Sequence, residues 1–189
     1  MRHSDILTRD GSVLLICDVQ KKCIKPIYKK EAMINNIKSL VSFAGLTGLP
    51  VLLTELSPQR FGTTIDEIKG LVPRLEAIKR TKYSCFGNEE LTLRLESMNT
   101  NRLIVLGMET HISICPTVLD AITRGYSVHV VLNATSAARK VNWKVAIEKM
   151  RRAGAVITTA DIVMHELMGG TDHPKYEQCL ELTKKISDL

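Results

Sequence analysis

The sequence contains no run of about 20 apolar residues, the length that a helix needs to cross a bilayer. Its first residues, MRHSDILTRDGS, lack the apolar core of a secretory signal. We therefore expect a soluble protein of the cytoplasm with no membrane partner. A very short mitochondrial presequence stays open as an alternative.

Aromatic residues make up only 4% of the chain, although its net charge is +6. The basic residues come as scattered pairs, such as Lys21-Lys22 and Arg151-Arg152, with no aromatic residues between them. Proteins that bind single-stranded nucleic acid need aromatic rings on which the bases stack. This pattern favours an ordinary solvated surface. Nucleic-acid binding remains an alternative because basic charge attracts phosphates.

Motifs for disulfides, metals and nucleotide cofactors are also missing. The five cysteines are an odd number without a CxxC pair, and Cys17, Cys85 and Cys115 lie within or beside apolar runs, which indicates a reducing compartment. The five histidines are dispersed and form no HExxH motif, and the sequence has neither GxGxxG nor a P-loop. We expect neither a metal nor a cofactor.

Short apolar runs are what the sequence does have, and they alternate with segments of helical periodicity. Its length of 189 residues and its 44% hydrophobic content suit one domain over residues 1–189. Unbroken apolar runs predict strands that are buried on both faces of a parallel sheet. We expect an α/β fold, a doubly wound three-layer αβα sandwich around a six-stranded, mainly parallel sheet. The expected strands are 13–17, 49–53, 103–107, 128–132 and 155–157, with a more polar sixth near 77–82.

Between these strands, apolar residues recur at i, i+3, i+4 and i+7, which predicts amphipathic helices. The last helix is expected to carry Pro174 in its first turn. Gly48, Gly125 and Gly154 stand where helices should end. The expected helices cover residues 31–48, 88–98, the segment around 143–150 and 174–187.

In an open α/β sheet, ligands bind beyond the carboxyl ends of the strands. Asp18 directly follows the first apolar run. A carboxylate at that depth must be hydrogen-bonded or paired, because burying it alone is costly. Asp18 is therefore a candidate site residue, with a purely structural role in a neighbouring loop as the alternative.

A second candidate region, GMETHISICPT (107–117), follows the fourth strand, expected at 103–107. Pro116 suits the first turn of the next helix, so that Thr110 or Ser113 could be its N-cap. Such an elbow directs backbone N–H groups and the positive end of a helix into the crevice, where they can stabilise an oxyanion or a nucleophile. His111 could contact a substrate there, whereas His129 lies in an apolar strand and reads as a core residue.

The sequence resembles the isochorismatase-like cysteine hydrolases, and within them the isochorismatase-domain-containing branch. The resemblance rests on LLICDVQ (14–20), LLTELSPQRFGTTIDEI (52–68), TKYSCF (81–86), the segment 107–131 and the segment 150–176. It implies a catalytic Asp-Lys-Cys triad, in which a thiolate attacks an amide-like carbon. It also implies a non-proline cis peptide that builds an oxyanion hole, here at Met108 and Glu109.

Only one of the three triad members keeps its identity in this sequence. Asp18 matches the aspartate of the family, whereas Arg80 stands at the lysine position and Ser113 at the cysteine position. Lys82 would share a strand face with Arg80 and could act as a base, which a guanidinium cannot. Cys115, two positions from Ser113, is the alternative nucleophile if the local register shifts.

These observations leave three functions open. The first is a hydrolase of a small amide, imide or vinyl-ether metabolite, with Asp18 as acid and base and a diverged triad. The second is a catalytically weakened relative that binds a metabolite or a partner. The third is a ribonuclease, since some protozoan relatives carry that label. We also expect a homo-oligomer, because oligomers are common in the family.

Overall fold

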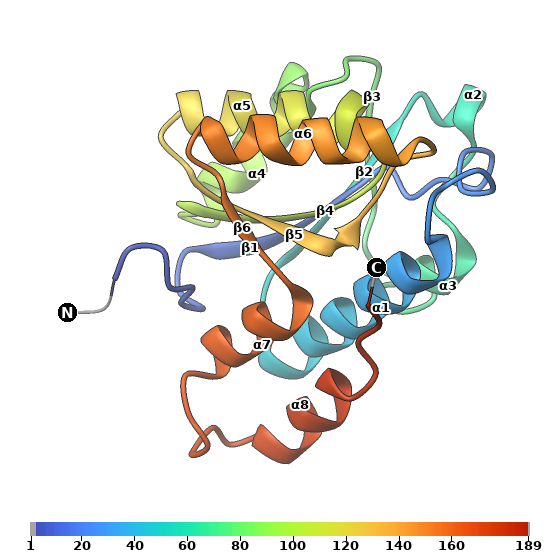
Figure 1. Ribbon diagram of the computed structural model, residues 1–189. Coiled ribbons are helices and arrows are strands. Elements are labelled where there is room, and N and C mark those ends of the chain that lie inside the picture. Colours follow the sequence, from blue (N-terminus) through green and yellow to red (C-terminus); the bar gives the residue numbers. More distant parts are fainter. Residues whose placement is uncertain (1–2, 189) are drawn as a thin grey trace.

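The computed structural model describes residues 3–188, in which the apolar runs form a six-stranded sheet with every pair of neighbours parallel. The strand order is β3-β2-β1-β4-β5-β6. This confirms the predicted α/β sandwich, with helices on both faces of the sheet (Figure 1). The strands are β1 (Ser12–Cys17), β2 (Val51–Leu56), β3 (Ile78–Arg80), β4 (Arg102–Gly107), β5 (Ser127–Thr135) and β6 (Val156–Thr158).

One helical layer holds α4, α5 and α6, and the other holds α1, α7 and α8 (Figure 1). The helices are α1 (Lys30–Thr47), α2 (Pro58–Phe61), α3 (Asp66–Lys69), α4 (Glu89–Ser97), α5 (Cys115–Thr123), α6 (Lys140–Arg152), α7 (Ala160–Met168) and α8 (Tyr176–Thr183), with a 3-10 turn η1 (Cys85–Gly87) and a π-helical turn η2 (Thr110–Ile114).

Each layer closes its own hydrophobic core against one face of the sheet. Along β1, Leu14 and Ile16 pack toward α1 and α7, whereas Val13 and Leu15 pack toward α4, α5 and α6. All four side chains are fully buried. Burial on both sides explains why β1 is an unbroken apolar run without alternation.

Two expected boundaries were wrong. The second strand begins at Val51 and continues through the buried residues Thr54 and Glu55, because neighbouring groups hydrogen-bond both polar side chains. The last helix begins at Tyr176, so Pro174 precedes it instead of lying in its first turn. Gly48, Gly125 and Gly154 do have positive φ angles where helices end.

The direction in which successive strands are added to the sheet reverses at the neighbouring strands β1 and β4. Strands β2 and β3 extend the sheet on one side of this pair, and β5 and β6 extend it on the other. A crevice opens outside the carboxyl ends of the strands at such a topological switch point. Asp18 and the segment after Gly107 lie at this point.

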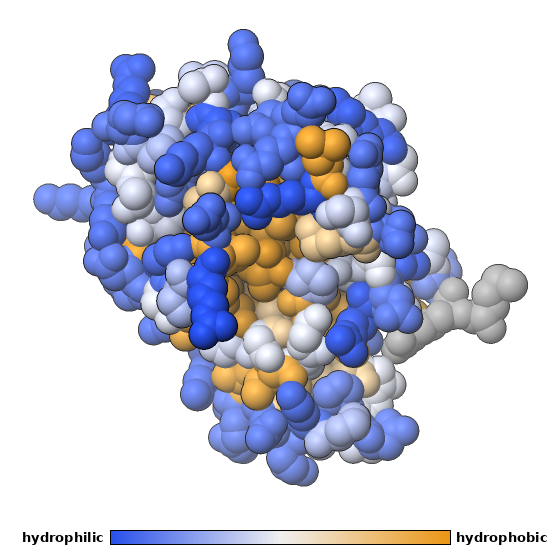
Figure 2. Space-filling view, turned by 180° about the vertical axis from the view of Figure 1, so that it is seen from behind, coloured by the Kyte–Doolittle hydropathy of each residue, from blue (hydrophilic) through white to orange (hydrophobic). Residues whose placement is uncertain are grey.

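Among residues 3–188, no helix combines the length and the hydropathy needed to cross a bilayer. The face opposite to the view of Figure 1 is mostly hydrophilic and surrounds a hydrophobic hollow (Figure 2). Exposed large hydrophobic side chains within the described part of the chain are Leu71, Tyr83, Leu93, Val141, Val145 and Ile162.

Candidate active site

Asp18 lies immediately beyond β1 in a left-handed backbone conformation, with φ of 55°. Its side chain is buried, and Thr54 Oγ1 at the end of β2 donates a hydrogen bond of 2.9 Å to its Oδ1. The parallel register places Cys17 beside Thr54 and beside Gly107, so three strand ends meet at the carboxylate. The sheet itself therefore positions Asp18.

Arg80 supplies the charge that compensates Asp18. It ends β3, where the alternation of the strand turns Lys79 outward and Arg80 inward. Its side chain is 0% exposed, and Nη2 donates to Asp18 Oδ2 in a buried ion pair. Nη1 donates to the backbone carbonyl of Lys82. The residue at the family's lysine position is thus in place, but as a guanidinium, which stays protonated in proteins.

Lys82 does not join this pair. The expectation that it shares a strand face with Arg80 was wrong, because β3 ends at Arg80 and the chain bends away. The Lys82 side chain is exposed, and only its carbonyl reaches the site.

Ser113, and not Cys115, faces Asp18. Ser113 is 1% exposed and lines the same pocket as Asp18, and its hydroxyl acts to lower the pKa of the Asp18 carboxyl. Cys115 begins α5 and packs into the core beneath α4, α5 and α6, where burial raises the pKa of its thiol. Of the two candidate nucleophiles, Ser113 therefore lies at the pocket of Asp18 and Cys115 lies in the core.

The predicted N-caps were wrong for a local reason. One π-helical turn, η2, precedes α5, and Ile114 takes the N-cap position without a side-chain bond. Thr110 instead donates through Oγ1 to the carbonyl of Ser136, at 2.8 Å. The wider π turn frees the Ser113 hydroxyl from capping and leaves it directed at Asp18.

The wall beside Ser113 is formed by Met108 and Glu109, which are joined by a cis peptide bond, as the resemblance implies. Both carboxylate oxygens of Glu109 accept from the backbone N–H of Ala138, at 3.0 and 3.1 Å. His111 Nδ1 lies 3.6 Å from Glu109 Oε2, and its Nε2 lies 3.2 Å from the side chain of Asn142. His111 itself lines a neighbouring depression, outside the Asp18 pocket.

A buried pair of thiols lies under the carboxylate. Cys85 Sγ is 3.9 Å from Cys17 Sγ and 3.7 Å from Thr54 Oγ1, the hydroxyl that bonds Asp18. Hydrogen bonding from Cys17, and then the charge of Arg80, lower the pKa of Cys85 to about 7 against the opposing effect of burial. Neither thiol lines the pocket, so both lie behind the wall that holds Asp18.

Burial raises the pKa of Asp18 above its ordinary value of 3.8. The charge of Arg80 and hydrogen bonds from Ser113 and Thr54 act in the opposite direction without cancelling the effect of burial. A carboxyl with a raised pKa exchanges its proton closer to neutral pH, which is what general acid–base catalysis requires.

The pocket over Asp18 is a cavity of about 140 Å³. Asp18 and Glu109 are the only charged side chains that line it among residues 3–188. Its remaining surface is mainly apolar. The lining residues are Asp18, Gln20, Cys23, Leu56, Phe61, Tyr83, Met108, Glu109, Ile112 and Ser113.

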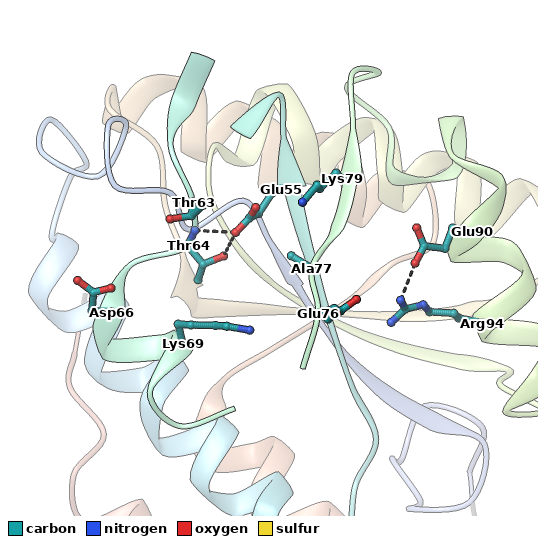
Figure 3. Close-up of a pocket in the computed structure, with 10 residues that line it drawn as sticks. All are labelled: Glu55, Thr63, Thr64, Asp66, Lys69, Glu76, Ala77, Lys79, Glu90 and Arg94. Carbon is teal, nitrogen blue, oxygen red and sulfur yellow. Dashed lines mark hydrogen bonds and ion pairs between the residues drawn. The ribbon is translucent and has the colours of Figure 1, made fainter. Parts of the chain in front are cut away.

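A larger groove of about 560 Å³ runs along the edge of the sheet at β3 (Figure 3). Some of its charged groups have partners within the protein: Glu55 accepts two bonds from Thr64, and Glu90 pairs with Arg94. Glu76 and Lys79, which also line the groove, are exposed. In the described part of the chain, no groove residue has a buried polar atom without a partner. The groove therefore has the character of a solvated edge of the sheet, in contrast to the buried ion pair at the Asp18 pocket.

Sequence reasoning missed Thr54, Cys85 and Gln20. Thr54 is a polar residue inside an apolar strand, a signal that was available, but its partner depends on the register of β1 and β2. Gln20 is 2% exposed and bonds both the N–H and the carbonyl of Leu56, which fixes the end of β2 beside the pocket.

His129 is fully buried, as expected of a core residue.

No three His, Cys, Asp or Glu side chains within residues 3–188 gather in a way that could hold a metal ion.

Comparison with known proteins identifies relatives along most of the chain. Residues 12–162 match the model of the isochorismatase domain. Isochorismatase domain-containing protein 2 of Xenopus laevis is 33% identical over 179 residues, covering 94% of this chain and 86% of the relative.

Solved structures share the fold. A structure described as the MAR1 ribonuclease of Caenorhabditis elegans superposes with a TM-score of 0.87 at 29% identity, over 96% of this chain and 94% of that one. The YcaC gene product of Escherichia coli, described as an octameric hydrolase of unknown specificity, gives a TM-score of 0.90 at 22% identity, over 98% of this chain and 93% of that one.

Proposed function

The chain belongs to the isochorismatase family, and on that premise we propose that it hydrolyses a small amide, imide or vinyl ether with Asp18 as the group that moves the proton. The observation that carries the proposal is the buried carboxyl of Asp18, with its raised pKa, at the base of a mainly apolar pocket.

In this mechanism Asp18 donates a proton to the leaving group or withdraws one from the attacking hydroxyl or water. Arg80 keeps its positive charge throughout and stabilises the ionised form of Asp18. Ser113 stands where the resemblance places the family's thiol, and its hydroxyl favours the ionised form of the Asp18 carboxyl. We assign stabilisation of the developing oxyanion to the backbone at Met108 and Glu109.

A serine hydroxyl is a much weaker acid than a thiol, so its activation needs a strong base. Within the described residues, the bases that line the pocket with Ser113 are the carboxylates of Asp18 and Glu109, which are weak bases, and Arg80 cannot accept a proton. Direct proton transfer by Asp18 to a substrate or a water is therefore the favoured route over covalent catalysis through Ser113.

The test compares Asp18→Asn with Asp120→Asn, a control that removes the same charge from an exposed position. Over a panel of small amides, imides and vinyl ethers, Asp18→Asn should lower turnover about 10²–10⁴-fold, the usual contribution of general acid–base catalysis. Asp120→Asn should keep it. If Asp18→Asn fails to fold, Asp18→Asn/Arg80→Met removes both buried charges together. Turnover that survives within twofold would rule out Asp18 as the proton carrier.

A binding protein without turnover is the second candidate, and the serine at position 113 favours it because the family's thiol is missing. Ligands would then raise the melting temperature without forming product. A homo-oligomer is proposed as well, since the similarly folded YcaC is described as octameric. Sedimentation of the purified chain tests this directly.

A ribonuclease is supported by the description of one solved relative and by the net charge of +6. The cavity over Asp18 opposes it, because it is small and the charged side chains that line it are acidic within the described residues. Cleavage of labelled RNA that depends on Asp18 and falls steeply with salt would reverse this ranking.

A further inference from the structure

The charges around the Asp18 pocket restrict what can enter it. Arg80 neutralises the charge of Asp18. Within the described residues, the one basic side chain that lies close to the Glu109 carboxylate is His111, at 3.6 Å. The Glu109 side chain is 18% exposed and lines the wall next to Ser113. The N–H of Ala138 donates to the Glu109 carboxylate, but within the described residues no lysine or arginine pairs with it. A ligand in the pocket therefore lies beside a carboxylate that keeps its negative charge without a lysine or arginine partner.

No lysine or arginine within residues 3–188 lines this pocket to receive an anion. Arg80 is 0% exposed and already paired with Asp18. Lys21 forms an ion pair of 2.7 Å with Asp66, away from the lining. The Arg60 guanidinium lies over the ring of Phe61, 5.6 Å from the ring centroid, and Arg60 is exposed. A substrate carboxylate would thus lose its water without gaining a charged partner, which is costly.

The size of the cavity sets a second limit. Its volume of about 140 Å³ is close to that of an engineered protein cavity of about 150 Å³ that binds benzene. It is below the range of about 300–1,000 Å³ that is usual for drug-sized ligands. Leu56, Phe61 and Ile112 supply apolar walls, so the part of the ligand that enters is compact and mostly hydrocarbon.

We propose that this pocket takes a small uncharged carboxamide or imide of roughly six to eight non-hydrogen atoms, and that Glu109 excludes carboxylates. The inference rests on the proposed hydrolase function and narrows its substrates, leaving out vinyl ethers that carry carboxylate groups. Glu109 is then a specificity-determining residue, whose side chain the N–H of Ala138 holds in place. The product acid of amide hydrolysis would be expelled by the same carboxylate.

The test uses three probes of nearly equal shape, each of about six non-hydrogen atoms like benzene: isobutyramide, isobutyrate and isobutyramidine, which are neutral, anionic and cationic. Their affinities are measured by ligand-observed NMR near neutral pH. Isobutyramide should bind at least about tenfold more tightly than isobutyrate, because like charges in contact repel strongly. Isobutyramidine should bind at least as tightly as the amide.

Glu109→Gln and Glu96→Gln separate the local effect from overall charge. The glutamine at 109 still offers an oxygen to Ala138, whereas Glu96 is exposed on α4 and outside the pocket. Glu109→Gln should reduce the preference for amide over carboxylate several-fold, and Glu96→Gln should leave it unchanged. Repeating the series at high salt screens the attraction of the basic surface for anions, and the preference should persist.

Isobutyrate that binds as tightly as isobutyramide, or a preference that Glu109→Gln leaves unaltered, overturns the proposal. Failure of all three probes to bind also overturns it, because the pocket would then not accept ligands of this size. The same spectra report conversion of isobutyramide to isobutyrate. Selective binding without conversion would contradict the hydrolase function and leave the specificity of the pocket standing.

Discussion

Replacing Arg80 by methionine should destabilise the protein in a manner that depends on pH. The Arg80 side chain is fully buried, and its removal takes away the cation that pairs with the Asp18 carboxylate. Breaking a buried ion pair from one side costs about 3–5 kcal/mol when the remaining charge stays buried. We expect a loss of that size in the free energy of unfolding near neutral pH.

The pH dependence follows from the pKa of Asp18, which burial raises and Arg80 lowers. Without Arg80 the pKa of Asp18 in the folded state rises further above its ordinary value of 3.8. The folded variant then holds a proton that the unfolded chain has released, so its stability falls as the pH rises above that value. Close to about pH 4 the carboxyl is protonated in the folded variant, and most of the loss should disappear.

Urea unfolding of the wild type and the variant at several pH values measures the difference. The double variant Asp18→Asn/Arg80→Met serves as the control, because it removes both charges and should recover at least about 2 kcal/mol relative to Arg80→Met alone. A loss that is equal at acidic and neutral pH, or a double variant no more stable than the single one, would refute the reasoning.

Two further predictions concern stability. Burial lowers the pKa of His129 from 6.5 to about 4. Between these two pH values the unfolded chain binds a proton that the folded protein does not, so the free energy of unfolding should fall by roughly 3 kcal/mol as the pH drops from 6.5 to about 4. Urea unfolding of His129→Leu should show no such fall. Gly107→Ala should cost about 3 kcal/mol or more, because the new Cβ would lie 2.1 Å from the carbonyl oxygen of Cys17 at φ of 120°; thermal melting should show it.

Both predictions have direct controls. His165→Leu changes a histidine that is exposed on α7, so it should leave the acid slope in place. Gly45→Ala adds a Cβ within α1 where no atom lies within 4 Å, and it should be neutral or slightly stabilising. An unchanged acid slope in His129→Leu, or a Gly107→Ala protein as stable as Gly45→Ala, would contradict these assignments.

The fold was predictable because burial on both faces of a parallel sheet leaves a plain mark in the sequence. The runs that became β1 and β4 are apolar throughout, and Asp18 and Gly107 mark where they end. The position of Asp18 at the carboxyl edge follows from that pattern alone. The resemblance added the cis peptide after Met108, which no periodicity indicates.

The contacts within the site were harder to predict, because they depend on where elements end and how they pair. Lys82 seemed to share a face with Arg80 only if β3 continued two residues further, and it does not. Ser113 seemed a possible helix cap because a π turn leaves no clear mark in composition. Thr54 and Cys85 are 31 residues apart in sequence, and only the folded sheet brings them together.

The position of β3 gives the site a dynamic property. This strand has three residues and lies at one edge of the sheet, where it pairs with β2, so the end of the sheet that carries Arg80 is weakly supported. Elements with few pairing partners open most readily while the remainder of a protein stays folded. Each opening of β3 withdraws Arg80 from Asp18 and favours uptake of a proton by the carboxyl. The protonation of the buried acid is therefore coupled to the fraying of an edge strand, and amide exchange along β3 reports on it.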